Sequence, residues 1–144
     1  MKPSVTRSYV NGLIATRDDD ELDWLSSAVC GCDQFDFQAP MYGLPKALFL
    51  FVESLSWFAQ GLRSGVWTYF EAKSPMQQQE MLAALRDLAP AGFAEQYAIG
   101  MKVWTDAAQI AEVDEWLDQN DERNNAFLWQ LLEQNREMID ALLP

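Results

Sequence analysis

The sequence predicts an all-α protein, a single-domain bundle of about seven or eight helices around a buried hydrophobic central helix. Its 144 residues are the usual length of one domain and are enough for a real core. Apolar residues recur at the spacing of a helix face through most of the chain. Prolines, glycines and acidic caps divide the chain into segments of helical length. We therefore expect one helical domain over residues 1–144.

Residues 44–70 are the most hydrophobic stretch and predict the central helix, followed by a short aromatic helix. One face of the central helix carries eight apolar side chains, namely Leu44, Leu48, Phe51, Val52, Leu55, Phe58, Ala59 and Leu62. The other faces are apolar too, with Phe49, Leu50 and Trp57. A helix that is apolar on all sides is expected to be buried. Gly61 and Gly65 mark its end or a bend.

Ahead of this stretch, the pattern predicts two helices and an irregular connection. The first helix covers residues 4–16, and its inner positions are Val5, Tyr9, Leu13 and Ile14. An acidic run then supplies the N-cap and first-turn acids of a helix that extends to Val29. Residues 31–43 indicate an irregular connection. Phe35 and Phe37 alternate there with acids, so a short strand-like piece is an alternative.

Two helices are predicted directly after the aromatic segment. Ser74 and Pro75 form an N-cap followed by a first-turn proline. The helix that they start has the inner positions Met81, Leu82, Leu85 and Leu88. The second helix covers residues 93–104, with the inner positions Phe93, Tyr97, Met101 and Trp104.

The last two predicted helices complete the bundle. Either Thr105 or Asp106 caps the first of them, whose inner positions are Ile110, Val113, Trp116 and Leu117. Asp121 is the expected cap of the second. The inner positions of this last helix are Phe127, Leu128, Leu131, Leu132, Ile139, Leu142 and Leu143.

The chain is strongly acidic, and the excess is concentrated in one segment. Twenty-two acids against ten bases give a net charge of −12. Residues 105–144 hold ten acids and two bases, a net charge of −8 in little more than a quarter of the chain. Such a field repels nucleic acid, anionic lipid and nucleotides, and it attracts basic protein surfaces. We therefore expect a basic protein as the partner, without direct binding to nucleic acid or membrane.

No stretch of the sequence predicts a membrane segment or a secretion signal. The longest apolar run, residues 47–52, is far too short to cross a bilayer. The first residues lack the continuous apolar run of a signal peptide. Cys30 and Cys32 are the only cysteines, and one intervening residue is a poor span for a structural disulfide. A soluble cytoplasmic protein is the expectation.

The residue types disfavour most catalytic chemistry. The chain has no histidine, the commonest general base and metal ligand. The two cysteines alone cannot complete a tetrahedral metal site, and no phosphate-binding glycine motif is present. We expect a non-enzymatic protein without cofactor or metal, and an enzyme based on paired carboxylates stays an alternative. The aromatic residues are expected in the core, with Trp104, Trp116 and Trp129 as alternative anchors of a protein interface.

The acidic segment supplies the candidate partner-binding residues, which are Glu112, Asp114, Glu115, Asp118, Asp121 and Glu122. Glu112, Glu115, Asp118 and Glu122 recur at intervals of three or four residues, which keeps them near one face of a helical path. Asp114 and Asp121 flank that face. Successive turns place such carboxylates roughly 5–6 Å apart. This spacing is broadly comparable with that of phosphates along DNA. A second candidate cluster comprises Asp18, Asp19, Asp20 and Glu21. The alternative is a solvated helix face without a partner.

Residues 65–102 carry a recognisable pattern of helix ends and helix interiors. A glycine and aromatic residues end one helix, at Gly65, Trp67, Tyr69 and Phe70. A leucine- and alanine-rich helix follows, with Leu82, Ala84, Leu85, Leu88 and Ala89. In these features the segment resembles a bacterial domain-of-unknown-function family that includes a dimeric DNA-mimic protein. The turn between the two parts departs from the family's asparagine-rich form, with Glu71, Ala72 and Lys73.

The resemblance implies an all-helical fold, homodimerisation and, in at least one member, the imitation of DNA by surface carboxylates. It transfers no functional residue to this chain. Together with the charge, it favours a non-enzymatic acidic module that occupies the DNA-binding surface of a basic partner. An immunity or antitoxin-like inhibitor of a single partner protein, with a partly apolar interface, is the alternative.

Overall fold

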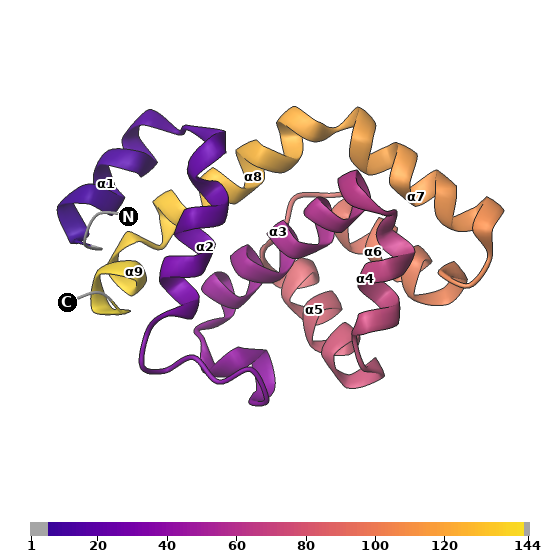
Figure 1. Ribbon diagram of the computed structural model, residues 1–144, viewed down its shortest axis with the longest axis horizontal. Coiled ribbons are helices and arrows are strands. Elements are labelled where there is room, and N and C mark those ends of the chain that lie inside the picture. The colour runs from indigo at the N-terminus through magenta and orange to yellow at the C-terminus, as the bar shows by residue number, and fades with distance from the viewer. Residues whose placement is uncertain (1–5, 143–144) are drawn as a thin grey trace. The chain divides into compact units, whose positions relative to one another are not determined.

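The structure is a computed structural model that describes residues 6–142. Within that range the chain forms nine α-helices, two short 3₁₀ helices and no β-strand (Figure 1). The prediction of an all-α fold is confirmed. The helices group into two compact units, of which unit 1 comprises residues 6–55 and 128–142 and unit 2 comprises residues 56–127. The single-domain organisation stays a prediction.

Unit 1 contains the first helices of the chain together with the last. Its elements are α1 (Arg7–Thr16), η1 (Asp19–Glu21), α2 (Leu22–Cys30), η2 (Pro40–Gly43), the first part of α3 (Lys46–Arg63), the last part of α8 (Asp121–Gln134) and α9 (Arg136–Leu142). α1 packs against α9. The Arg17 side chain forms an ion pair with Glu133, so the end of α1 is also tied to α8.

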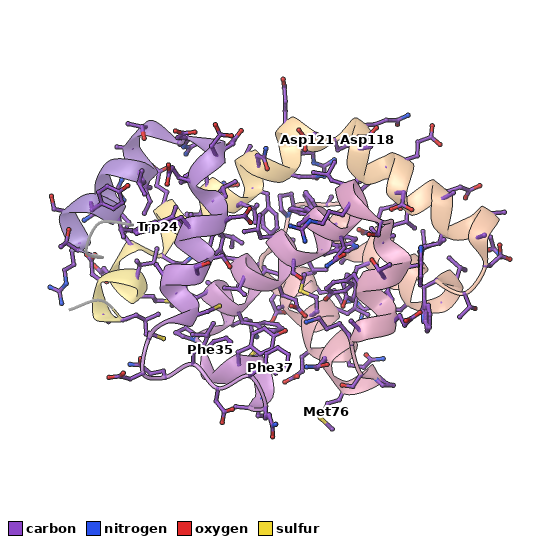
Figure 2. All side chains as sticks on the ribbon, viewed as in Figure 1. Trp24, Phe35, Phe37, Met76, Asp118 and Asp121 are labelled. Atoms are coloured by element: carbon purple, nitrogen blue, oxygen red, sulfur yellow. The ribbon has the colours of Figure 1, made fainter. Side chains whose placement is uncertain are left out.

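The connection between α2 and α3 is irregular, and the strand-like alternative for Phe35 and Phe37 is wrong. It closes through a 2.9 Å hydrogen bond from the backbone N–H of Asp36 to the carbonyl of Tyr42. Gly43 has φ +70°, and a Cβ there would lie 2.5 Å from the Gln34 carbonyl oxygen. The Phe35 and Phe37 rings pack on the Tyr42 ring instead of forming a strand. Figure 2 labels both phenylalanines in this connection.

Unit 2 is built around a cluster of aromatic side chains. Its elements are the end of α3, α4 (Val66–Ala72), α5 (Pro75–Leu88), α6 (Phe93–Val103), α7 (Ala107–Gln119) and the start of α8. α6 lies against α4, α5 and α7 (Figure 1). The aromatic cluster comprises Trp57, Phe58, Tyr69, Phe70, Phe93, Tyr97 and Phe127. The Tyr69 and Tyr97 hydroxyls, both buried, are hydrogen-bonded at 2.9 Å.

Most predicted helix boundaries in unit 2 are confirmed because local caps set them. Ser74 accepts a hydrogen bond from the Gln77 N–H, and the Gln77 side chain accepts one from the Ser74 N–H. Asp106, rather than Thr105, caps α7 through the N–H groups of Ala108 and Gln109.

Several sequence predictions need correction. Leu62 is a predicted member of the apolar face of the central helix, but the residue is 68% exposed and lies one residue before the end of α3. Leu88 is exposed as well. Asp121 is the first residue of α8 instead of its cap. The last predicted helix is two helices, because the chain leaves the helical path at Asn135. Val5 and Leu143, two other predicted inner positions, lie outside the described residues.

Candidate functional site

α7 and the start of α8 carry five exposed carboxylates in a short stretch of sequence. They belong to Glu112, Glu115, Asp118, Asp121 and Glu122, and we call them the α7–α8 acidic surface. None of the five forms an ion pair within residues 6–142. Glu115 accepts a 3.1 Å hydrogen bond from the Gln119 side chain, the next turn along α7. The surface is therefore locally negative.

The structure groups the six predicted acids differently from the prediction, which placed four near one face with Asp114 and Asp121 beside it. Asp114, Asp118 and Asp121 follow the helical period of three to four residues and line one hollow in unit 2. Glu112, Glu115 and Glu122 do not line it. Figure 2 shows Asp118 and Asp121 where α7 passes into α8, with only Asn120 between the two helices.

This acidic hollow has a cavity volume of about 20 Å³, and the space above it brings the total to about 270 Å³ when open solvent is included. Its lining residues come from α3, α7 and α8 and are Phe58, Gly61, Leu62, Asp114, Leu117, Asp118, Asp121 and Asn124. The walls thus combine apolar side chains with three carboxylates and one amide. No lysine or arginine is among the lining residues.

Asp114 differs from its neighbours because the fold uses it. Its side chain is half-buried and accepts a 2.8 Å hydrogen bond from the Val66 N–H, at the first residue of α4. Gly65, which precedes it with φ +97°, has no side chain that could cap α4. Burial raises the pKa of Asp114, and the Val66 hydrogen bond only partly offsets this effect. Its predicted place beside an exposed acidic face is therefore corrected to a half-buried capping position.

Asn124 is the lining residue that sequence reasoning missed. Its side chain is 2% exposed, and its amide nitrogen donates a 2.9 Å hydrogen bond to the Leu117 carbonyl. Its Oδ1 atom is buried, and no described residue donates a hydrogen bond to it. The signal was present in the sequence, because Asn124 falls on the inner stripe of α8, three residues before Phe127.

The second predicted acidic cluster lies in unit 1 and largely serves the local fold. Asp18 caps η1 by accepting a 3.1 Å hydrogen bond from the Asp20 N–H. Asp19 accepts a 2.7 Å hydrogen bond from the Trp129 indole. Glu21 is half-buried, and Asp20 is exposed. Because two of the four carboxylates are occupied within the fold, this cluster is the weaker candidate for a partner site.

Two of the tryptophans predicted as alternative interface anchors, and both cysteines, are buried or half-buried. Trp129 is buried, so the idea that it anchors an interface is wrong for this residue. Trp116 is half-buried, and the Arg123 guanidinium lies 5.6 Å from the centroid of its ring. Cys30 and Cys32 are half-buried free thiols, and burial, followed by the neighbouring Cys32, raises the pKa of Cys30.

The chemistry of the acidic hollow is that of hydrogen-bond acceptance and negative charge. Residues 6–142 contain no group of three histidine, cysteine or acidic side chains able to hold a metal ion. In the same range no helix is both long and apolar enough to cross a bilayer. A cationic group with several N–H donors is the ligand that carboxylates and a carbonyl oxygen suit best.

Comparisons with models of known protein families, with curated proteins and with solved structures find no match. The resemblance over residues 65–102 stays a prediction.

Proposed function

We propose that this protein acts without catalysis, by binding a basic partner protein and occupying the partner's DNA-binding surface. The α7–α8 acidic surface would replace the phosphates that the partner otherwise contacts. The observation that carries this proposal is the group of five exposed carboxylates that form no ion pair within the described residues.

Electrostatics explains why such a surface favours a partner. Like charges on successive turns of a helix repel one another and reduce its stability by a few tenths of a kcal/mol per pair. A basic surface that docks on them removes this repulsion and adds attraction across the interface. The effect depends on ionic strength, because salt screens exposed charges beyond about 8–10 Å. A DNA mimic should therefore bind tightly at low salt and release its partner as salt rises.

The test begins with the immobilised full-length protein and a lysate of the source cells at low ionic strength. A salt gradient elutes the captured protein, which is then assayed for binding to duplex DNA by mobility shift. The free acidic protein is added as a competitor. The proposal requires that the eluted protein binds DNA and that the acidic protein displaces the DNA.

Two double variants with the same change in net charge test whether capture of the partner depends on the α7–α8 acidic surface. Glu115→Lys with Asp118→Lys should abolish capture, while circular dichroism shows unchanged helix content. Asp33→Lys with Glu71→Lys makes the same change in net charge at exposed positions outside this surface and should retain most of the binding. Equal capture by both double variants would refute the proposed role of α7 and α8.

An inhibitor of a single partner, with a partly apolar interface, is the second candidate. The observation that favours it is the exposure of large apolar side chains in unit 2, with Leu62 at 68% and Trp67 at 42%. Such an interface gives an affinity that changes little with salt and a captured protein that does not bind DNA. The salt gradient therefore separates the two candidates.

The carboxylate enzyme is the third candidate and has one observation in its favour. Asp114 combines a raised pKa with a place in a hollow beside two further carboxylates. Its Oδ1 atom, however, already accepts the Val66 N–H, and the chain has no histidine to share proton transfer. We therefore propose binding rather than catalysis.

A further inference from the structure

We propose that Cys30 and Cys32 are a redox-active pair, which closes reversibly to a disulfide only when the last turn of α2 unwinds. The pair belongs to the Cys-Gly-Cys stretch at the end of α2 in unit 1, and both residues are half-buried free thiols. It lies outside the α7–α8 acidic surface, so this proposal stands independently of the proposed function.

The backbone brings the two cysteines close enough for a disulfide. Gly31, between them, continues the helical path of α2 with φ −85° and ψ 0°. On such a path the Cα atoms of residues two positions apart are separated by about 5.4 Å. Disulfides usually join residues whose Cα atoms are roughly 4.4–6.8 Å apart. The distance therefore permits the bond.

The direction of the two side chains prevents closure while this turn is helical. Residues two positions apart point to nearly opposite sides of a helix and do not face each other. The Gly31 N–H donates a 3.0 Å hydrogen bond to the Ser27 carbonyl. The Cys32 N–H donates a 3.2 Å hydrogen bond to the Val29 carbonyl. Closure needs the backbone to move and therefore breaks these bonds, which suits a reversible disulfide rather than a permanent structural one.

Gly31 gives this turn the freedom to unwind. Its φ is open to every amino acid, and a Cβ there would meet nothing closer than the Ser27 carbonyl oxygen at 3.4 Å. Nor is it the left-handed glycine that commonly ends a helix. The helical turn thus does not require a glycine. Glycine has the widest range of backbone conformations, so its place between the cysteines favours ring closure over one intervening residue.

The turn is linked to the connection that follows it. The Cys32 carbonyl accepts a 3.2 Å hydrogen bond from the Phe35 N–H, and the Phe35 ring packs on Tyr42. The Tyr42 hydroxyl in turn donates to the buried Glu53 of α3. Movement of Cys32 therefore reaches the connection between α2 and α3, and the oxidation state of the pair would alter this part of unit 1.

Oxidation by a low-molecular-weight disulfide, here oxidised glutathione, balances in atoms and electrons. Burial, followed by the neighbouring Cys32, raises the pKa of Cys30, so we assign the first attack to Cys32. The Cys32 thiolate attacks one glutathione sulfur, forms a mixed disulfide and releases one glutathione. The Cys30 thiolate then attacks the Cys32 sulfur and displaces the second glutathione. The two thiol protons and two electrons of the pair end on the two glutathione molecules.

The test places the full-length protein in mixtures of reduced and oxidised glutathione without air. Free thiols are then trapped with excess N-ethylmaleimide, and the products are identified by mass spectrometry. The proposal expects a product about 2 Da lighter than the reduced chain, with neither glutathione nor N-ethylmaleimide attached. Excess reduced glutathione should return it to the dithiol. In this product the amides of Gly31 and Cys32 should exchange hydrogen faster, because their hydrogen bonds are lost.

Unfolding the chain tests whether closure is coupled to unwinding. In concentrated urea the turn is already lost, so closure no longer breaks its hydrogen bonds. At one glutathione composition, the ratio of disulfide to dithiol should therefore be about tenfold higher in urea than in the folded protein.

Two matched glycine variants locate the effect. Gly31→Ala should lower the ratio of disulfide to dithiol about threefold in the folded protein, because alanine favours the helical turn. Gly12→Ala makes the same change within α1 of the same unit, where nothing lies within 4 Å of the added Cβ. It should change the ratio less than about 1.5-fold. Circular dichroism verifies that both variants fold.

Three results would overturn the inference. If both cysteines carry only glutathione or N-ethylmaleimide at every glutathione composition, the pair does not close. If the ratio of disulfide to dithiol is equal in urea and in the folded protein, closure does not need α2 to unwind. If Gly31→Ala and Gly12→Ala have equal effects, the turn at Gly31 does not control the pair.

Discussion

Replacement of Asp114 tests whether this half-buried carboxylate stabilises the fold as a remote cap of α4. Asp114→Ala removes the acceptor of the Val66 N–H, and the Val66 residue itself is fully buried. Loss of a capping acceptor costs typically about 1 kcal/mol, within a range of roughly 0.5–2 kcal/mol. For a chain of 144 residues, this loss should lower the melting temperature by about 4 °C.

Asp114→Asn separates the hydrogen bond from the charge. The asparagine keeps an Oδ1 acceptor for Val66 and carries no charge that burial could penalise. At neutral pH the free energy of unfolding of this variant should therefore equal that of the natural protein or exceed it by up to about 0.5 kcal/mol. Asp118→Asn is the matched control, because Asp118 is exposed and no described residue bonds to it, and it should change stability by less than about 0.5 kcal/mol.

The pH dependence follows from the direction of the pKa shift. The folded protein holds the Asp114 proton to a higher pH than the unfolded chain does, because burial raises the pKa above its ordinary value of 3.8. The stabilisation from this proton is complete below the ordinary pKa and is lost as pH rises through the raised one. Urea unfolding by fluorescence and circular dichroism from acid to neutral pH should show this loss in the natural protein. In Asp114→Asn this pH-dependent contribution to the free energy of unfolding should be absent.

Two outcomes would refute this reasoning. One is an Asp114→Asn variant as destabilised at neutral pH as Asp114→Ala. The other is an unchanged difference in unfolding free energy between the natural protein and Asp114→Asn across the acidic range.

Three further changes test the packing and the caps. Gly100→Ala should destabilise by more than about 2 kcal/mol, because its Cβ would lie 2.4 Å from the buried Phe70 ring; Phe70→Leu added to it should recover part of the loss in urea unfolding. Tyr42→Phe removes the hydroxyl that donates a 2.9 Å hydrogen bond to the buried Glu53, and it should cost about 1–3 kcal/mol in the same assay. Ser74→Ala should cost about 1 kcal/mol through loss of the α5 cap, whereas Ser74→Asp should retain most of the stability in thermal unfolding.

Much of the helical architecture could be predicted from the sequence because short-range contacts decide it. The start of α5 depends on Ser74 and Pro75, and the start of α7 depends on Asp106, all within one turn of the groups that they cap. The apolar spacing likewise identified most inner positions of α5 to α8, whereas Leu88 is exposed and Met101, Trp104 and Trp116 are half-buried. These features depend on residues three or four positions apart, which the sequence displays directly.

The sequence also determined the acidic character of α7 and α8, since charge and its concentration in one segment need no coordinates. It did not determine which carboxylates lie together. Acids spaced three or four positions apart can be grouped on several faces of a helix. Which group forms a site depends on what packs beside the helix. In this protein α3 contributes Phe58, Gly61 and Leu62 to the hollow. The acids that line the same hollow are Asp114, Asp118 and Asp121.

Only the tertiary structure decided the roles of Asp114 and Asn124. The hydrogen bond of Asp114 joins it to Val66, 48 residues earlier in the chain, and its burial follows from that contact. The Leu117 carbonyl, seven residues earlier, accepts from the Asn124 amide, and the buried Asn124 oxygen has no donor among the described residues. Composition and periodicity thus establish that the protein is helical and negative, because both are local or additive properties. Which carboxylate becomes half-buried and accepts a hydrogen bond depends on contacts between segments that are distant in sequence. No local sequence pattern contains that information.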